Sequence, residues 1–146
     1  MGRGFFGTRA SLVADVNLVV QVGILLVLAV GLFQNRNRGW SAWRALVSSV
    51  VALQALLIIA VMNPSLTRSL PFAIRNPFAA GPRFLWVHVA IGTVAELIGA
   101  FLVLSSSQVP SAKNEQARTR RVLAIMLVLW TVALLFGCAL YLTRYT

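Results

Sequence analysis

The sequence predicts an all-α integral membrane protein, a single domain that folds as a bundle of four transmembrane helices. The chain of 146 residues is 59% hydrophobic and 11% charged, which is more apolar surface than a soluble domain of this length can bury. Four apolar runs reach or approach the length of about 20 residues that crosses a bilayer. Thirteen Lys and Arg stand against three Asp and Glu, and these cations lie between or beside the apolar runs, where they meet lipid headgroups. That placement argues against a nucleic-acid partner and favours membrane lipids and other integral membrane proteins.

The apolar runs define the predicted spans. Because no water in the hydrocarbon core can pair with backbone N–H and C=O groups, each run must be a helix. The second run is the shortest, and Arg44 beside its start can extend it by reaching the interface with its side chain. The four predicted spans cover, in order, residues 12–33, 45–62, 85–104 and 122–141.

The connection between the second and third spans, residues 63–84, differs from the other two. It contains four prolines interleaved with Leu, Phe, Ile and Arg. The prolines argue against a long helix, and the apolar residues argue against a free loop. We expect this segment to lie along the membrane surface and to cap one end of the bundle.

The other two connections, residues 34–44 and 105–121, are polar and rich in arginine. Dense positive charge close to the ends of spans is typical of cytoplasmic loops. Because an even number of spans places both termini on one side, we expect the termini and residues 63–84 to face the outside.

Each span carries one polar side chain near its midpoint, within about 3 Å of a common plane at the helical rise. A charged side chain at the bilayer centre costs about 2.5–3.5 kcal/mol, so a carboxyl group there needs compensation. We expect Glu96 to be protonated or paired with the amide of Gln54 or Gln21. A structural clasp is the favoured interpretation and a proton path the second, because nothing here forms a graded relay. This polar core comprises Gln21, Gln54, Glu96 and Thr131.

A second polar layer lies roughly 8–11 Å from the midpoints, on the side of the termini. It contains Asp15, Asn17 and His88, with Tyr141 beyond them. His88 is the only histidine, and two interpretations stay open for it. In the first, which we favour, one ring nitrogen donates to Asn17 or to a carboxylate and ties the first helix to the third. In the second, the free nitrogen ligates a metal or heme iron at an interface, and another protein supplies the remaining ligand.

The third span presents small residues on the face that carries His88 and Glu96. Its Ala95-x-x-x-Gly99 pattern lets another backbone approach closely, as small residues do between transmembrane helices. We therefore expect this face to point into the bundle.

Catalytic and metal-binding patterns are missing from the sequence. It contains no Ser–His–Asp set, no Gly-rich phosphate loop, no CxxC and no pair of carboxylates at one depth, so we expect no enzyme activity. The single cysteine, Cys138, excludes an intrachain disulfide. One histidine and one cysteine are too few for a Zn or Cu site built by this chain alone.

The last span reads RRVLAIMLVLWTVALLFGCALYLTRY. Its Trp130-x6-Gly137-x3-Tyr141 pattern resembles the closing motif of the YozB/CtaM-like four-helix membrane proteins, the domain-of-unknown-function family four-twenty. Asn17 in the first span resembles an early asparagine of that family. His88 lies near the start of the third span, as in that family. The resemblance covers most of the chain from about Asn17 onwards.

Members of that family are implicated in the maturation of heme–copper oxidases, and they typically carry further histidines that this chain lacks. The matching regions read WSAWR, VMNPS and EQARTRR. The resemblance therefore implies a non-enzymatic accessory or assembly protein beside a respiratory oxidase, in the bacterial cytoplasmic membrane. It implies no cofactor for the isolated chain and leaves a heme at an interface open. The alternative is a structural transmembrane subunit that fills a helix groove or holds lipid, quinone or pigment.

Overall fold

The computed structural model describes residues 7, 10–34, 40–105 and 113–145. These residues are almost entirely helical, and none of them lies in a strand. The middle parts of the two basic connections, 35–39 and 106–112, fall outside the described residues. The elements are α1 (Leu12–Gln34), α2 (Trp40–Leu57), the π-helix η1 (Ile58–Met62), α3 (Asn63–Arg75), α4 (Ala80–Ser105) and α5 (Lys113–Tyr145).

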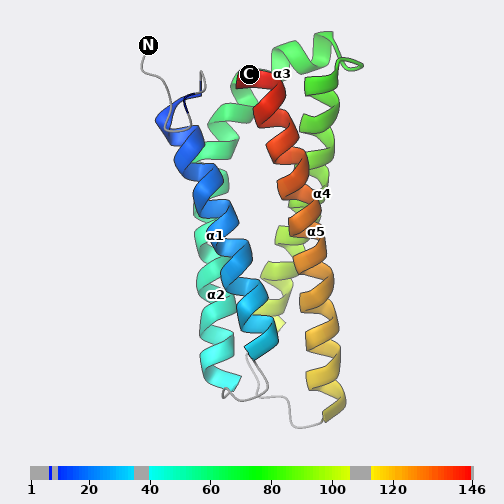
Figure 1. Ribbon diagram of the computed structural model, residues 1–146. Helices are drawn as coiled ribbons and strands as arrows, with labels where there is room; N and C mark the ends of the chain where they lie inside the picture. Colours follow the sequence, from blue (N-terminus) through cyan, green and yellow to red (C-terminus); the bar gives the residue numbers. More distant parts are fainter. Residues whose placement is uncertain (1–6, 8–9, 35–39, 106–112, 146) are drawn as a thin grey trace.

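Four helical stretches are long and apolar enough to cross a membrane, which confirms the predicted all-α bundle of four helices. Figure 1 shows that α1 begins and α5 ends at the same end of the bundle, as an even number of spans requires. Both α4 and α5 extend beyond the predicted spans, because their flanking residues continue the helices past the apolar core. The four stretches are Leu12–Leu32, Arg44–Arg75, Ala80–Ser105 and Ala117–Tyr145.

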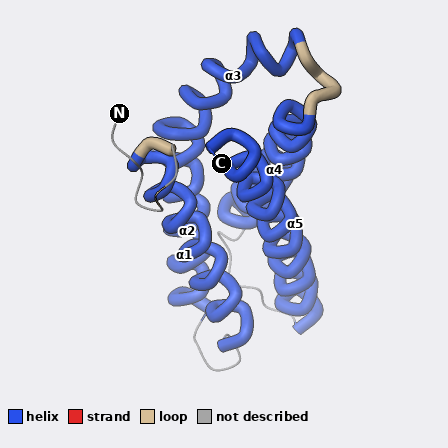
Figure 2. The backbone as a smooth tube through the Cα atoms, turned by 45° about the horizontal axis from the view of Figure 1, so that its top comes forward, coloured by secondary structure: helices blue, strands red, loops and turns tan. Residues whose placement is uncertain are grey.

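The expectation that prolines prevent a long helix within 63–84 is wrong. Residues Asn63–Arg75 form a helix of 13 residues, and α2, η1 and α3 follow one another without a break. Only a short turn separates α3 from α4. Figure 2 shows α3 running from η1 across the end of the bundle towards the start of α4, which agrees with the predicted cap at that end. Its position at a membrane surface stays a prediction.

The π-helix explains how a proline enters this helical run. Pro64 lies in the first turn of α3, and in an unbroken α-helix its ring would clash with the carbonyl four residues earlier. The backbone N–H of Asn63 instead bonds to the carbonyl of Ile58, five residues back. This wider turn relieves the crowding around the ring, and such turns are frequent at functional sites.

The apolar core packs tightly where α2, α4 and α5 meet. Ala95 is fully buried, and a Cβ at Gly99 would lie 3.0 Å from Val51 Cγ2 and 3.2 Å from Met126 Sδ. This close approach confirms the prediction that the Ala95-x-x-x-Gly99 face points into the bundle. The buried cluster contains Ile24, Leu28, Val47, Val50, Val51, Ala95, Leu102, Leu123, Met126 and Trp130.

Candidate functional site

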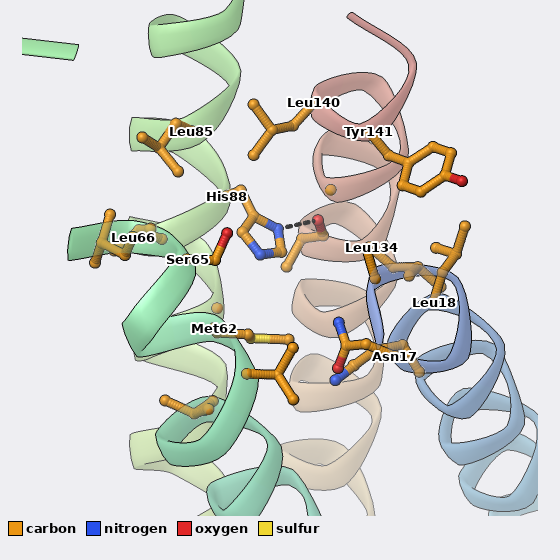
Figure 3. Close-up of a pocket in the computed structure, with 18 of the residues that line it drawn as sticks. Asn17, Leu18, Met62, Ser65, Leu66, Leu85, His88, Leu134, Leu140 and Tyr141 are labelled. Carbon is orange, nitrogen blue, oxygen red and sulfur yellow. Dashed lines mark hydrogen bonds between the residues drawn. The ribbon is translucent and has the colours of Figure 1, made fainter. Parts of the chain in front are cut away.

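A cavity of about 370 Å³ lies among α1, α2, η1, α3, α4 and α5. Its lining extends along α5 from Trp130 to Tyr145, which is about 22 Å at the helical rise. Because its volume of about 370 Å³ extends over about 22 Å, the cavity is narrow. The volume itself is within the usual range of small-molecule sites. Figure 3 shows the part around His88, with Leu85 and Leu140 on the side towards the end of α5.

His88 is held in the cavity wall by a backbone carbonyl. Its Nδ1 lies 2.7 Å from the carbonyl oxygen of Ala133 in α5. Because a carbonyl oxygen only accepts, Nδ1 must carry the hydrogen and donate it. In the neutral ring Nε2 is then a hydrogen-bond acceptor, and it makes no hydrogen bond to any residue that the structure describes. The ring therefore presents one free lone pair to the cavity.

Gly137 makes this arrangement sterically possible. A Cβ at position 137 would lie 3.0 Å from Cε1 and 3.1 Å from Nδ1 of His88. Gly137 also lies four residues after Ala133, so it leaves the Ala133 carbonyl unshielded on the side from which the imidazole approaches. The glycine of the Trp130-x6-Gly137-x3-Tyr141 pattern thus positions the histidine.

The predicted partner of His88 is wrong. We expected a ring nitrogen to donate to Asn17 or to a carboxylate and to tie the first helix to the third. The ring instead ties α4 to α5 through the Ala133 carbonyl. Each helix carbonyl keeps a second lone pair after its own helical bond, and a sequence gives no signal for which carbonyl a distant side chain will reach.

Two other members of the predicted outer polar layer, Asp15 and Tyr141, join α1 to α5. The Tyr141 hydroxyl donates to Oδ1 of Asp15, whose side chain is 1% exposed. Asn17 also lies at the cavity, and its Oδ1 is buried with no hydrogen-bond partner among the described residues. The structure therefore shows one hydrogen bond within the predicted layer, between Tyr141 and Asp15, and His88 bonds outside it.

The predicted polar core does not form a clasp. Thr131 donates to the carbonyl of Leu127 within its own helix, at 2.8 Å. Glu96 Oε2 is buried and meets no hydrogen-bond partner in the described ranges. Gln21 and Gln54 line the cavity, whereas Glu96 does not. The expected amide pairing of Glu96 is therefore wrong: sequence position fixes depth in a helix but not which neighbour a side chain faces.

Sequence reasoning missed the polar role of Trp130. Its indole Nε1 and the Oε1 of Gln54 are both buried without a partner in the described part of the chain, and each residue is 7% exposed. Asn17 Oδ1 and Gln21 Nε2 are in the same state, and all four residues line the cavity. Leaving a buried donor or acceptor unsatisfied costs about 1–3 kcal/mol. Two donors and two acceptors are thus unsatisfied on residues that line one cavity.

A further contact at the outer end of the cavity was also unforeseen. The Arg144 guanidinium donates to the Ser69 hydroxyl at 2.7 Å, which links the end of α5 to α3. Arg144 and Tyr145 line this end of the cavity. Its inner end, by contrast, carries only neutral polar groups.

The described residues contain no group of three or more His, Cys, Asp or Glu side chains able to hold a metal ion. A heme iron would need only one ligand from this chain, if another protein supplied the second ligand. His88 fits that single role, because ligating histidines commonly donate their second ring N–H to a backbone carbonyl.

Comparisons of this chain with known protein families, with curated proteins and with solved structures find no match.

Proposed function

We propose that this protein is a non-enzymatic integral membrane accessory or assembly protein that works beside a respiratory electron-transfer complex of the heme–copper oxidase type. One observation supports the proposal. The five residues that carry the resemblance come from three helices, and all of them line the same cavity. They are Asn17, His88, Trp130, Gly137 and Tyr141.

The chemistry of the cavity suits holding a molecule better than transforming one. Apart from His88 and Arg144, its polar residues are neutral amides, hydroxyls and an indole. Asp15 is not among the lining residues, and it accepts a hydrogen bond from Tyr141, which is one of them. A lone imidazole with its Nδ1 hydrogen committed to a carbonyl can accept a hydrogen bond or ligate, but none of the described lining residues is a carboxylate that could act with it as an acid or base.

Heme is the cofactor that the resemblance raises, and it would supply a redox-active iron. If heme binds at an interface with the partner protein, His88 Nε2 would be the ligand from this chain and the partner would supply the other. The isolated chain is then expected to purify without heme and without stoichiometric Cu, Zn or Fe. Absorption spectroscopy and metal analysis measure this. Heme that co-purifies with the isolated chain and is lost in His88→Ala would show that the chain binds it alone.

The second candidate is a permanent structural subunit that fills a helix groove or holds lipid, quinone or pigment. The cavity with its unsatisfied polar atoms favours this candidate as much as the first. The two differ in how long the protein stays with its partner. Purification in mild detergent separates them, since a subunit stays at fixed stoichiometry and an assembly factor is found only with immature complex.

The decisive experiment is deletion of the gene followed by measurement of oxidase activity and oxidase-bound heme in isolated membranes. We expect both to fall while the oxidase polypeptides remain present. Complementation with Trp86→Phe, an exposed position outside the cavity, should restore activity, and Gly137→Leu should not. Unchanged oxidase activity in the deletion strain would contradict the proposal.

The proposed location is the bacterial cytoplasmic membrane, with the termini and α3 outside. The charge of the two arginine-rich connections supports this orientation. Cysteines introduced at Thr67 in α3 and at Ser107, in a Cys138→Ser background, should react oppositely with an impermeant thiol reagent. Labelling of Ser107→Cys from the outside would reverse the orientation and leave the bundle unchanged.

A further inference from the structure

The outer end of the cavity lies between α3 and the end of α5. Ser65 and Leu66 line it from α3, and Leu140 and Arg144 line it from α5. Among the described residues, no Cα atom of α3 lies within 8 Å of a Cα atom of α5 or of α1. The backbones are not packed together on this side, so only side chains can close the cavity between them.

A side-chain hydrogen bond bridges this gap. The Arg144 guanidinium donates to the Ser69 hydroxyl at 2.7 Å. That hydroxyl donates its own hydrogen to the carbonyl of Ser65 at 2.8 Å, so its oxygen is left to accept from Arg144. The guanidinium carbon also lies 5.8 Å from the centre of the Tyr145 ring, within the range of a cation–π interaction. Both partners are thus oriented for the bond that joins α3 to α5.

The rest of α3 has little hold on the bundle. It packs against η1 and α4, yet Ala73 is its only buried residue. Phe72 and Ile74 are 60% and 63% exposed, so their apolar side chains fix it only weakly to the other helices. An element with so few buried contacts has the low local stability from which moving segments are drawn.

Both ends of α3 can change direction. At its start the π-helix η1 leads into Pro64, and helices bend most readily at π-turns and at prolines. At its end residues 76–79 form a compact turn, in which the N–H of Ala79 bonds to the carbonyl of Asn76 at 3.2 Å. Four residues can span up to about 13 Å when they are extended. Opening this turn therefore gives the end of α3 room to move.

We propose that α3 is a lid over the outer end of the cavity. It pivots at η1, residues 76–79 supply the slack, and the Arg144–Ser69 hydrogen bond holds it closed. When that bond breaks, Leu66 moves away from Leu140 and the cavity opens. The inference concerns access to the cavity, so it depends neither on the molecule that the cavity holds nor on the partner complex.

The first measurement follows the position of the lid, in the full chain in lipid nanodiscs and in a Cys138→Ser background. Nitroxide labels on cysteines introduced at Phe72 in α3 and Leu135 in α5, both exposed positions, report the distance between the two helices by pulsed electron paramagnetic resonance. We expect a closed distance and a longer, open one. In Arg144→Met the ratio of open to closed should rise about fivefold, since one hydrogen bond shifts an equilibrium by about this factor.

Three further variants tie the movement to this hydrogen bond. Ser69→Ala removes the acceptor and should raise the open population as Arg144→Met does, whereas Ser69→Thr keeps a hydroxyl group and should match the original protein. Arg75→Met removes an arginine from the last turn of the same helix and is the matched control for charge. An unchanged distance distribution in both Arg144→Met and Ser69→Ala would overturn the proposal.

The second measurement tests whether the lid covers the cavity. Leu85 lines the cavity and is 8% exposed. Leu85→Cys, again with Cys138→Ser, should react about fivefold faster with a thiol reagent when Arg144→Met is added. Phe78→Cys, at a position that is 81% exposed and outside the cavity, should react at the same rate in both backgrounds.

Circular dichroism identifies a variant that fails to fold, and Leu140→Cys then replaces Leu85→Cys as the probe of the cavity. A link that is merely structural would leave the labelling rate unchanged. A longer distance in Arg144→Met without faster labelling of the cavity would show that α3 moves without controlling access, and this result would also overturn the lid.

Discussion

The two halves of the bundle are built differently. The packed half lies towards the end of α1 and the start of α2, where Leu28 and Leu123 are almost completely buried and a Cβ at Gly31 would lie 2.6 Å from Leu46 Cδ2. The cavity half lies towards α3 and the end of α5. There the helices are joined by side-chain hydrogen bonds around an open volume.

This difference separates two tasks within one small chain. Close packing of small and apolar side chains fixes the relative positions of the helices without help from polar groups. The polar contacts of the cavity half link helices through side-chain hydrogen bonds around the cavity. The packed half therefore provides stability, and the cavity half provides the site.

The packed half should tolerate no added volume at Gly99. A Cβ there would lie 3.0 Å from Val51 Cγ2 and 3.2 Å from Met126 Sδ. We expect Gly99→Val to lower the free energy of unfolding by about 2–3 kcal/mol, the upper part of the range of about 1–3 kcal/mol that overpacking a core typically costs. Gly23→Val is the matched control, because a Cβ at Gly23 meets nothing within 4 Å. Thermal unfolding in detergent, followed by circular dichroism, measures both. Equal stability of the two variants would show that the packed half is not tightly packed.

The sequence predicted the packed half better than the cavity half, for a physical reason. Hydropathy located all four spans, and the spacing of Ala95 and Gly99 identified a close helix contact. These signals depend on composition and on local spacing along one helix. Small residues four positions apart mark close contacts between transmembrane helices in general, so they can be recognised in a sequence.

The cavity half depends on which way each helix is rotated, and the sequence says little about that. The spans are apolar on all sides, so no polar face marks the direction of the core. Glu96 shares its depth with Gln54 yet does not line the cavity, and His88 bonds to a backbone carbonyl. The π-helix before Pro64 changes the direction in which Met62 and its neighbours face, and no local sequence pattern predicted this π-helix.

The Asp15–Tyr141 contact should be the strongest single link of the cavity half. Tyr141→Phe removes a donor from a carboxyl group that is 1% exposed. We expect a loss of about 1–3 kcal/mol in the free energy of unfolding. A double-mutant cycle with Asp15→Asn should give a coupling energy of about 1–2 kcal/mol. Tyr145→Phe removes a hydroxyl group one turn later and serves as the control. A coupling energy near zero would mean that the contact does not hold α1 to α5.

Gly137→Ala should disturb the site and leave stability almost unchanged. The alanine gains about 1 kcal/mol in helix propensity, and the displaced His88 ring loses a hydrogen bond worth about the same. Gly92→Ala is the control, since its Cβ would make an ordinary 4.0 Å contact with Ala133 Cβ, and it should stabilise the protein by the full propensity gain.

The tautomer of His88 reports the disturbance directly. Nitrogen NMR of the imidazole should show the Nδ1–H form in the original protein and in Gly92→Ala. The signal should change in Gly137→Ala. An unchanged tautomer in Gly137→Ala, together with a full gain in stability, would show that the glycine does not position the ring.

The smallest effects are expected where the predicted clasp fails to form. Glu96 Oε2 and Gln54 Oε1 are both buried without a partner among the described residues, so neither side chain stabilises the other. Glu96→Gln should change the free energy of unfolding by less than about 0.5 kcal/mol.

Gln54→Leu should be neutral or slightly stabilising, because it replaces an unsatisfied buried amide with an apolar side chain of similar size. A clasp gives the opposite result for Gln54→Leu, since removing the amide would leave the carboxyl group of Glu96 without compensation at the bilayer centre. Melting temperatures of the two single variants and of the double variant decide between these outcomes. If Gln54→Leu destabilises the original protein and has no effect in a Glu96→Gln background, the two side chains are paired in the membrane, and the boundary between the packed half and the cavity half must be redrawn to include Glu96.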